Sequence, residues 1–158
     1  MVLSDVEILS ALKAGIIKIV PFNKNCLNAS GYDLRLKNTV MIEPGVQELV
    51  STIERIELDF SVVGFLNIRS SFAREGVIGS LALVDPGFRG QLTIALFNAS
   101  RQRVKIKKGE RFVQVTFAKL GGRAKRGYIG RYQDSEGVVK SLRWGSSIKS
   151  RKKAQKML

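Results

Sequence analysis

The sequence predicts a mainly β fold, a distorted β-barrel or jelly roll, with a short N-terminal helix and one internal helical turn. Short apolar or alternating runs recur from residue 16 to about residue 119, and glycine, proline and asparagine separate them. The chain has 158 residues and 44% hydrophobic content, which suits one compact globular domain with its own core.

The helix is expected at the start of the chain. Ser4 and Glu7 have the spacing of a capping box, apolar residues follow at helical spacing, and Gly15 would end the helix. The internal helical turn is expected at Ser70–Glu75, the one segment that interrupts the β pattern. The predicted strands are Ile16–Val20, Thr39–Ile42, Gln47–Ser51, Ile53–Leu58, Val62–Ile68, Val77–Val84, Leu92–Phe97, Val104–Ile106 and Arg111–Phe117.

The chain becomes polar and basic after Gly121 and Gly122. We therefore expect a single β domain over residues 1–142, whose last part, about 121–142, is an arm that closes over a site or onto a neighbour. Residues 143–158 carry six cations and no acid, and we expect them to form a disordered tail.

Composition narrows the range of possible functions. The net charge of +14 favours anionic partners, and nucleic-acid contact by the basic tail is a less favoured alternative to a solvated tail. The sequence has no histidine, which excludes a Ser-His-Asp triad, a Cys-His dyad and a histidine-bound zinc. Cys26, the lone cysteine, is expected to be a small buried hydrophobe. No apolar run is long enough to span a bilayer and no signal peptide is recognisable, so we expect a cytoplasmic protein.

The segment Ile68–Glu75 has the side chains of an anion site. Arg69 offers a planar fork for phosphate oxygens, and Ser70 and Ser71 open a helical turn whose N–H groups and hydroxyls bind anions. Arg74 would lie one turn after Ser70, on the same side. The alternative is an ordinary capped turn with surface arginines.

A second candidate segment runs from Leu83 to Asn98. Asp85 opens the turn Asp85-Pro86-Gly87, and a strand follows in which Ala95 points with Thr93 and Phe97. By itself, Asp85 is adequately explained as a turn residue.

Both segments resemble the dCTP deaminase / dUTPase superfamily, as do Ala29–Arg35 and Gly109–Gln114, in the same order; Tyr128–Gly137 is a partial match. The resemblance implies a dUTPase-type β domain, a homotrimer, and a deoxynucleoside triphosphate substrate. It also implies Mg²⁺ held mainly by the substrate phosphates, with no direct protein ligand and with Asp33 in its outer shell.

The resemblance also implies individual roles. Asp85 would be the general base that activates water for attack on the α-phosphorus, and Phe88 would pack on the deoxyribose beside a base site that includes Leu83. The phosphates would contact Arg69, Ser70, Ser71, Gln114, Arg131 and Tyr132, with Arg74 as a secondary contact.

Ala95 decides between the two activities of the superfamily. It occupies the place of the glutamate that moves protons in the deaminases, and alanine has no proton to move. We therefore expect a dUTP pyrophosphatase that forms dUMP and pyrophosphate. The alternatives are a dCTP deaminase, including a bifunctional one, and a non-catalytic nucleotide-binding regulator.

Overall fold

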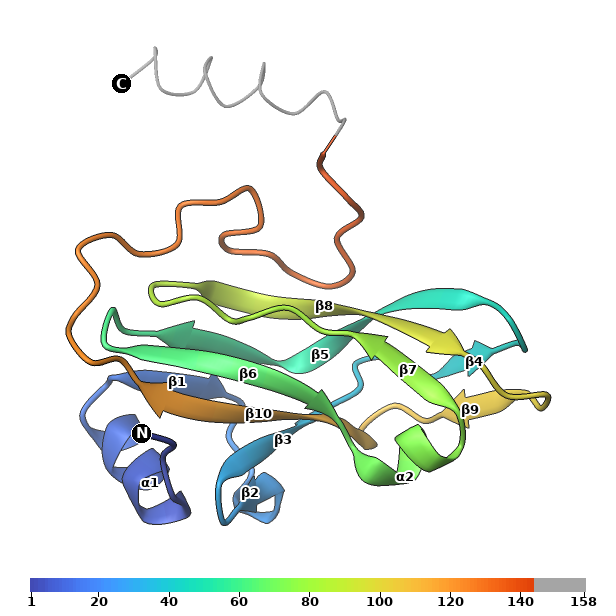
Figure 1. The fold of residues 1–158 in the computed structure, drawn as a ribbon, viewed down its shortest axis with the longest axis horizontal. Coiled ribbons are helices and arrows are strands. Elements are labelled where there is room, and N and C mark those ends of the chain that lie inside the picture. Colours follow the sequence, from blue (N-terminus) through green and yellow to red (C-terminus); the bar gives the residue numbers. More distant parts are fainter. Residues whose placement is uncertain (144–158) are drawn as a thin grey trace.

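The computed structural model describes residues 1–143, so the predicted tail lies outside the described residues except for Arg143. The fold is mainly β, as predicted, with two α-helices and one 3₁₀ helix (Figure 1). The elements are α1 (Asp5–Lys13), β1 (Ile17–Val20), η1 (Lys24–Cys26), β2 (Leu27–Asn28), β3 (Gly31–Arg35), β4 (Val40–Ile42), β5 (Gln47–Leu58), β6 (Val62–Ile68), α2 (Ser70–Arg74), β7 (Val77–Ser80), β8 (Arg89–Asn98), β9 (Val104–Ile106) and β10 (Arg111–Lys119).

Two four-stranded sheets form the body of the molecule. Their strand orders are β1-β5-β8-β7 and β2-β3-β10-β6, and β4 and β9 form a separate two-stranded ribbon at one end (Figure 1). One continuous apolar core gathers residues from both sheets. In β8 the even-numbered residues are buried, and the odd-numbered ones, among them Gln91, Thr93 and Ala95, are half-buried or exposed. The odd face is therefore the one that can meet a ligand.

The N-terminal helix has the predicted capping box. The Ser4 hydroxyl accepts a hydrogen bond from the Glu7 amide, and the Glu7 carboxylate accepts one from the Ser4 amide at 3.0 Å. Gly15 follows the helix with φ of 71°, a conformation that favours glycine. Cys26 is buried, as expected, and burial raises the pKa of its thiol. No helix among the described residues is long and apolar enough to cross a membrane.

Three strand predictions were wrong in detail. The two strands expected at Gln47–Ser51 and Ile53–Leu58 are one strand, β5, with a register shift between Ser51 and Arg55 opposite β8. At this bulge the Thr52 hydroxyl replaces a main-chain acceptor, since it accepts from the Leu92 amide at 3.0 Å. The strand expected at Val77–Val84 ends at Ser80, and the chain from there to Asp85 borders a pocket.

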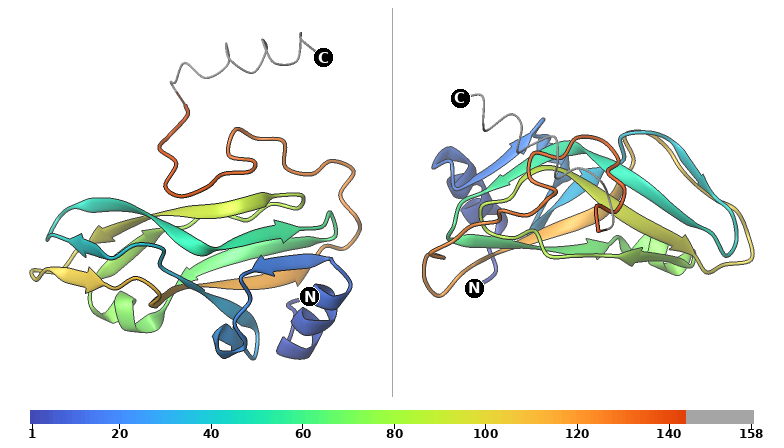
Figure 2. Two further views of the ribbon diagram at one scale, coloured as in Figure 1. Left: turned by 180° about the vertical axis from the view of Figure 1, so that it is seen from behind. Right: turned by 90° about the horizontal axis from the view of Figure 1, so that it is seen from above.

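The arm leaves the end of β10 and passes over the sheet that contains β5 and β8 (Figure 2). It carries no helix or strand of its own over residues 121–143. Main-chain hydrogen bonds fix its position. They join the arm to the turn before β6, to the loop that contains Asp85 and to the start of β8.

Candidate active site

Most of the predicted site residues line one of two separate pockets of the chain. The first, here called the Asp85 pocket, has a volume of about 370 Å³, within the range of small-molecule sites. It is lined by Ala82, Leu83, Val84, Asp85, Phe88, Gln91, Leu92, Thr93, Tyr128, Tyr132, Ser135 and Val139. The second, the Asp33 pocket, has a volume of about 360 Å³ and is lined by Asn28, Asp33, Asn67, Ile68, Arg69, Ser70 and Gln114.

The loop before β8 places the exposed residue Asp85 in the lining of its pocket. The Asp85 carbonyl accepts from the Phe88 amide at 3.1 Å, which closes a turn, and the Gly87 amide donates to the Leu58 carbonyl at 2.9 Å. Gly87 has φ of 80°, and a Cβ atom there would lie 2.6 Å from the Phe60 ring, so only glycine fits. The turn leaves the Asp85 carboxylate exposed, on a backbone that is held in place.

Thr93 offers main-chain hydrogen-bonding groups to the Asp85 pocket. Along β8 the odd-numbered residues turn their N–H and C=O groups away from β5, as the bond from the Gln91 amide to the Ser135 carbonyl shows. Ala95 uses its groups in pairing with Ser80, the last residue of β7. Thr93 lies between Gln91 and Ala95 on this edge, and its amide and carbonyl have no partner among residues 1–143. A donor and an acceptor on one residue match the edge of a pyrimidine.

An aromatic pair closes the inner side of this pocket. Phe88 is buried, and its ring meets that of Tyr128 edge to face, with 5.5 Å between the centroids. The Tyr128 amide donates to the Pro86 carbonyl at 2.7 Å, which fastens this part of the arm to the turn. The pocket therefore combines a flat apolar wall with one carboxylate.

Arg131 and Tyr132, the predicted phosphate contacts of the arm, face the end of the arm itself. The Arg131 guanidinium donates to the carbonyls of Leu142 and Arg143, and the Tyr132 hydroxyl accepts from the Leu142 amide at 3.1 Å. Tyr132 also lines the Asp85 pocket, whereas Arg131 does not. A role for Arg131 in phosphate binding stays a prediction.

The Asp33 pocket is built around a buried carboxylate between two guanidinium groups. Asp33 lies in β3, and its Oδ2 is 3.3 Å from Arg69 Nε and 3.6 Å from Arg111 Nη1. The Arg69 Nη1 also donates to the Arg111 carbonyl at 3.2 Å. Gln114 of β10 pairs with Asp33 on one side and with Asn67 of β6 on the other. Cations and amides thus surround an open space that suits an anionic group.

A glycine lets β3 and β10 approach closely at this pocket. A Cβ atom on Gly31 would lie 2.7 Å from the Val115 carbonyl oxygen, so a side chain there would push the two strands apart. The Asp33 carboxylate and the amide oxygens of Asn28, Asn67 and Gln114 are oxygen donors, which fits a Mg²⁺ ion held through water beside bound phosphates. No cluster of three or more acidic or cysteine ligands occurs within residues 1–143.

Three further predicted residues line neither pocket in this chain. Ser71 and Arg74 are exposed on α2, which has only five residues. Ala95 is half-buried on the same face of β8 as Thr93, between Leu49 of β5 and Ser80 of β7. The structure does not bring Ala95 together with Ser70 and Arg74 within one chain.

The two pockets lie toward opposite ends of β6. Val84, which lines the Asp85 pocket, bridges to Gly64 near the start of β6, whereas Ile68 at its end lines the Asp33 pocket. Four residues of strand separate these ends by about 13 Å. Figure 1 shows the loop between β7 and β8 at one end of the body and α2 at the other.

The sequence interpretation missed several pocket residues. Thr93 and Tyr128 are the most informative, and Asn28, Asn67, Gln91 and Val139 are further examples. Arg111, which was also given no role, contacts Asp33 beside its pocket. Alternation along the strand after Asp85 already placed Thr93 on the same face as Ala95. Thr93 could therefore have been predicted as a site residue together with Ala95. Arg111 and Tyr128 lie in segments that resemble the superfamily, but no local pattern gave them a role, because their partners Asp33 and Phe88 lie far away in the sequence.

Comparison with known proteins identifies the family of the chain. A dCTP deaminase-like family model matches residues 37–120. A dCTP deaminase of Thermococcus kodakarensis is 46% identical over 142 residues, covering 80% of this chain and 92% of that protein. A probable deoxyuridine 5'-triphosphate nucleotidohydrolase of Sulfolobus islandicus rod-shaped virus 1 is 34% identical over 154 residues, covering 88% of this chain and 97% of that protein.

Solved structures show the same fold at low sequence identity. A 2'-deoxycytidine 5'-triphosphate deaminase from Agrobacterium tumefaciens superposes with a TM-score of 0.66 at 16% identity, covering 76% of this chain and 48% of that chain. The dUTPase of EIAV superposes with a TM-score of 0.57 at 18% identity, covering 71% of this chain and 93% of that chain. The matching family model and the relatives above 30% identity show that the chain belongs to the dCTP deaminase-like family, within the superfamily that also contains the dUTPases.

Proposed function

We propose that the protein is a dUTP pyrophosphatase, which hydrolyses dUTP to dUMP and pyrophosphate. The observation that carries the proposal is Ala95 on the outward face of β8, where the resembling deaminases have a proton-carrying glutamate. Asp85 is the only acid that lines its pocket among the described residues. One carboxylate supplies a base for attack on phosphorus but leaves no second acid for proton transfer to a pyrimidine.

In the proposed mechanism the exposed carboxylate of Asp85 accepts a proton from the water that attacks the α-phosphorus. The Thr93 amide and carbonyl bind the edge of the base, and Phe88 packs on the deoxyribose. Arg69, Ser70 and Gln114, which line the Asp33 pocket, hold the phosphate oxygens and stabilise the charge that develops during transfer. A Mg²⁺ ion bound to the phosphates would neutralise further charge, with Asp33 in its outer shell.

We also propose that the active protein is a homotrimer whose sites form between chains. The separation of the two pockets supports this, because the predicted base site and the predicted phosphate site of one chain lie toward opposite ends of β6. A second chain that presents its Asp33 pocket to the first would complete the site. We propose that the protein acts in the cytoplasm, where deoxynucleoside triphosphates are used.

Complementation between inactive variants tests both parts of the proposal. Asp85→Asn and Arg69→Ala chains, with different tags, are expected to lose most turnover when each is expressed alone. After co-expression in equal amounts, about a quarter of the sites would combine an intact Asp85 with an intact Arg69 from another chain, so about a quarter of the wild-type turnover should return.

The matched control pairs Arg69→Ala with Gln114→Ala. Both residues line the Asp33 pocket of one chain, so this pair should restore nothing. Absence of restored turnover with the Asp85 and Arg69 variants would refute the shared site. Near-normal turnover by Asp85→Asn alone would refute the base, because loss of a general base typically lowers the rate about 10²–10⁴-fold.

The second candidate function is dCTP deamination. The dCTP deaminase of Thermococcus kodakarensis at 46% identity favours it. Ala95 opposes it, because alanine cannot exchange the protons that attack of water on cytosine requires.

A further inference from the structure

Residues 133–139 of the arm, here called the strap, extend the sheet at the point where β7 has ended. The Asp134 amide donates to the Arg89 carbonyl at 2.8 Å, and the Gln91 amide donates to the Ser135 carbonyl at 2.8 Å, in parallel register. Farther along, the Val139 amide donates to the Thr93 hydroxyl at 3.0 Å. The strap thus lies on the edge of β8 that faces the Asp85 pocket.

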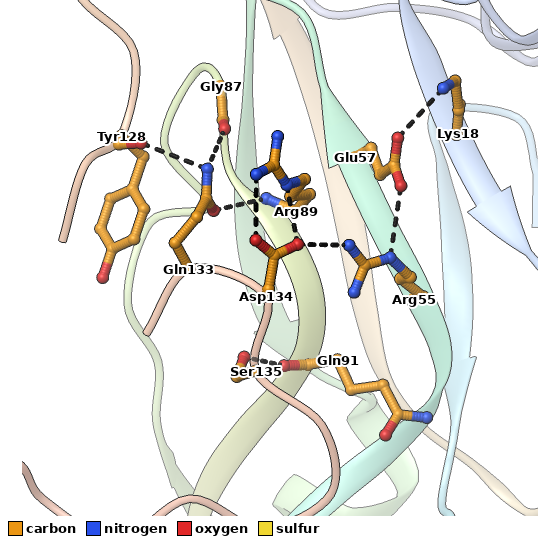
Figure 3. A network of polar contacts seen from close by, with 10 residues as sticks. All are labelled: Lys18, Arg55, Glu57, Gly87, Arg89, Gln91, Tyr128, Gln133, Asp134 and Ser135. Atoms are coloured by element: carbon orange, nitrogen blue, oxygen red, sulfur yellow. Dashed lines mark hydrogen bonds and ion pairs between the residues drawn. The ribbon is translucent and has the colours of Figure 1, made fainter. Parts of the chain in front are cut away.

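Asp134 joins the strap to two arginines of the body (Figure 3). Its carboxylate accepts from Arg89 Nε at 2.7 Å and from Arg89 Nη2 at 3.0 Å, and also from Arg55 Nη2 at 2.7 Å. Arg55 in turn contacts Glu57 at 3.2 Å, and Glu57 contacts Lys18 at 3.1 Å. A line of alternating charges therefore runs from β1 through β5 to the strap.

Asp134 has a positive φ angle, which is unusual for a residue other than glycine. Its φ of 59° makes it the one non-glycine residue with positive φ among the described residues. Aspartate and asparagine tolerate this conformation better than most residues do. The main chain at Asp134 is held there while its side chain reaches both arginines.

The body is shaped to receive the strap. Gln133 accepts from the Arg89 amide at 2.9 Å and donates to the Gly87 carbonyl at 2.8 Å. A Cβ atom on Gly90 would lie 2.8 Å from the Ser135 hydroxyl, so a larger residue would block the approach. The contact therefore depends on features of both the body and the strap.

The root of the arm is fastened independently of Asp134. Arg123 contacts Asp59 at 2.7 Å and lies 5.3 Å from the centre of the Phe60 ring, and the Ala124 amide donates to the Phe60 carbonyl at 2.9 Å. Loss of the Asp134 ion pairs should loosen the strap, which keeps its contacts through Gln133, Ser135 and Val139, while this root stays attached.

We propose that Asp134 is a positioning residue, which fixes the strap on the same chain and thereby completes the wall of the Asp85 pocket. Ser135 and Val139, from the strap, line that pocket together with Tyr132, which precedes it. A strap that is docked before the nucleotide arrives leaves less of the chain to be ordered on binding, which favours affinity. The effect on substrate affinity rests on the proposed function, whereas docking of the strap does not.

Hydrogen exchange of the Gln91 amide measures docking without any nucleotide, since this amide donates to the strap. Asp134→Asn keeps the tolerance for positive φ and removes the charge. The matched control is Glu136→Gln, a neighbouring exposed acid that forms no ion pair within residues 1–143. Exposed ion pairs are individually weak, so exchange should become about 5-fold faster in Asp134→Asn and stay unchanged in Glu136→Gln. Equal exchange in all three proteins would overturn the proposal.

Turnover of dUTP then tests the consequence for the pocket. In Asp134→Asn we expect KM to rise about 5-fold with kcat within about 2-fold of wild type, and in Glu136→Gln neither should change. Faster exchange with an unchanged KM would show that Asp134 fastens the strap without positioning the pocket. If neither the wild-type protein nor the two variants hydrolysed dUTP, the proposed function would be refuted. The hydrogen-exchange measurement would still test whether Asp134 holds the strap.

Discussion

Replacing Glu54 by glutamine tests the polar contact that joins the two sheets beside the Asp33 pocket. Glu54 lies in β5 and is fully buried, with 0% exposure. Its carboxylate accepts from the Arg35 amide at 2.9 Å and from Arg35 Nε at 2.6 Å. Arg35 ends β3, the strand that carries Asp33, and its side chain is 19% exposed. The ion pair between Glu54 and Arg35 therefore holds the end of β3 against β5.

The expected loss follows from these contacts. Glutamine keeps the shape and one acceptor, but its amide nitrogen would face Arg35 Nε, which is also a donor. Removing one partner of a buried pair costs about 3–5 kcal/mol. Arg35 keeps its bond to the Pro21 carbonyl at 3.3 Å and partial access to water, which places Glu54→Gln near the lower end, at about 3 kcal/mol. For a chain of this size that corresponds to a Tm lower by about 6–12 °C.

Denaturant and thermal unfolding at one fixed protein concentration measure this loss, since assembly makes stability depend on concentration. Glu43→Gln is the matched control. Glu43 contacts Arg103 at 2.7 Å, but both side chains are at least half exposed, so its loss should stay below about 1 kcal/mol. A Glu54→Gln protein as stable as the Glu43→Gln control would refute the reasoning from burial.

Two further predictions concern the Asp85 pocket and the strap. Ala95→Glu should lower dUTP turnover about 2- to 10-fold, because it adds a carboxylate on the face of Thr93 near an anionic ligand, and it should yield at most a trace of uracil nucleotide from dCTP, since a proton relay needs support from its neighbours. Product chromatography checks this, and unchanged dUTP kinetics would mean that residue 95 lies away from the site. The second prediction is pH-dependent. Hydrogen bonds from Arg89 and then Arg55 hold the pKa of Asp134 at about 2, below the ordinary 3.8. A carboxyl group with a lowered pKa stabilises the folded form above its ordinary value, so the protection factor of the Gln91 amide should be constant above about pH 5 and fall as the pH drops from 3.8 toward about 2. Loss of protection near neutral pH would contradict this account of the strap.

Local patterns predicted the parts of the fold that depend on local interactions. The capping box of Ser4 predicted α1, and alternation predicted most of β8 and β10. Strand β3 was not predicted as a strand, because Asp33 and Arg35 make it look polar. Those charges are tolerated beneath the surface only because Arg69, Arg111 and Glu54 meet them, and these partners come from three other parts of the chain.

The site was predictable to a similar extent. The superfamily resemblance singled out Asp85, which turn chemistry alone explains as a turn residue, and the structure places it in a pocket with Leu83 and Phe88. The division of the site residues between two pockets was not predictable, because it depends on which end of β6 each segment reaches. The strap was equally hidden, since Asp134 meets Arg55 across 79 positions of sequence.

The products formed from dUTP and from dCTP test the central claim most directly. The purified protein is incubated with each nucleotide and Mg²⁺, and the products are separated by chromatography. The absence of a carboxylate at Ala95, together with Asp85 in its pocket, predicts dUMP and pyrophosphate from dUTP and no uracil nucleotide from dCTP. Formation of dUTP or dUMP from dCTP at a rate comparable to dUTP hydrolysis would contradict it.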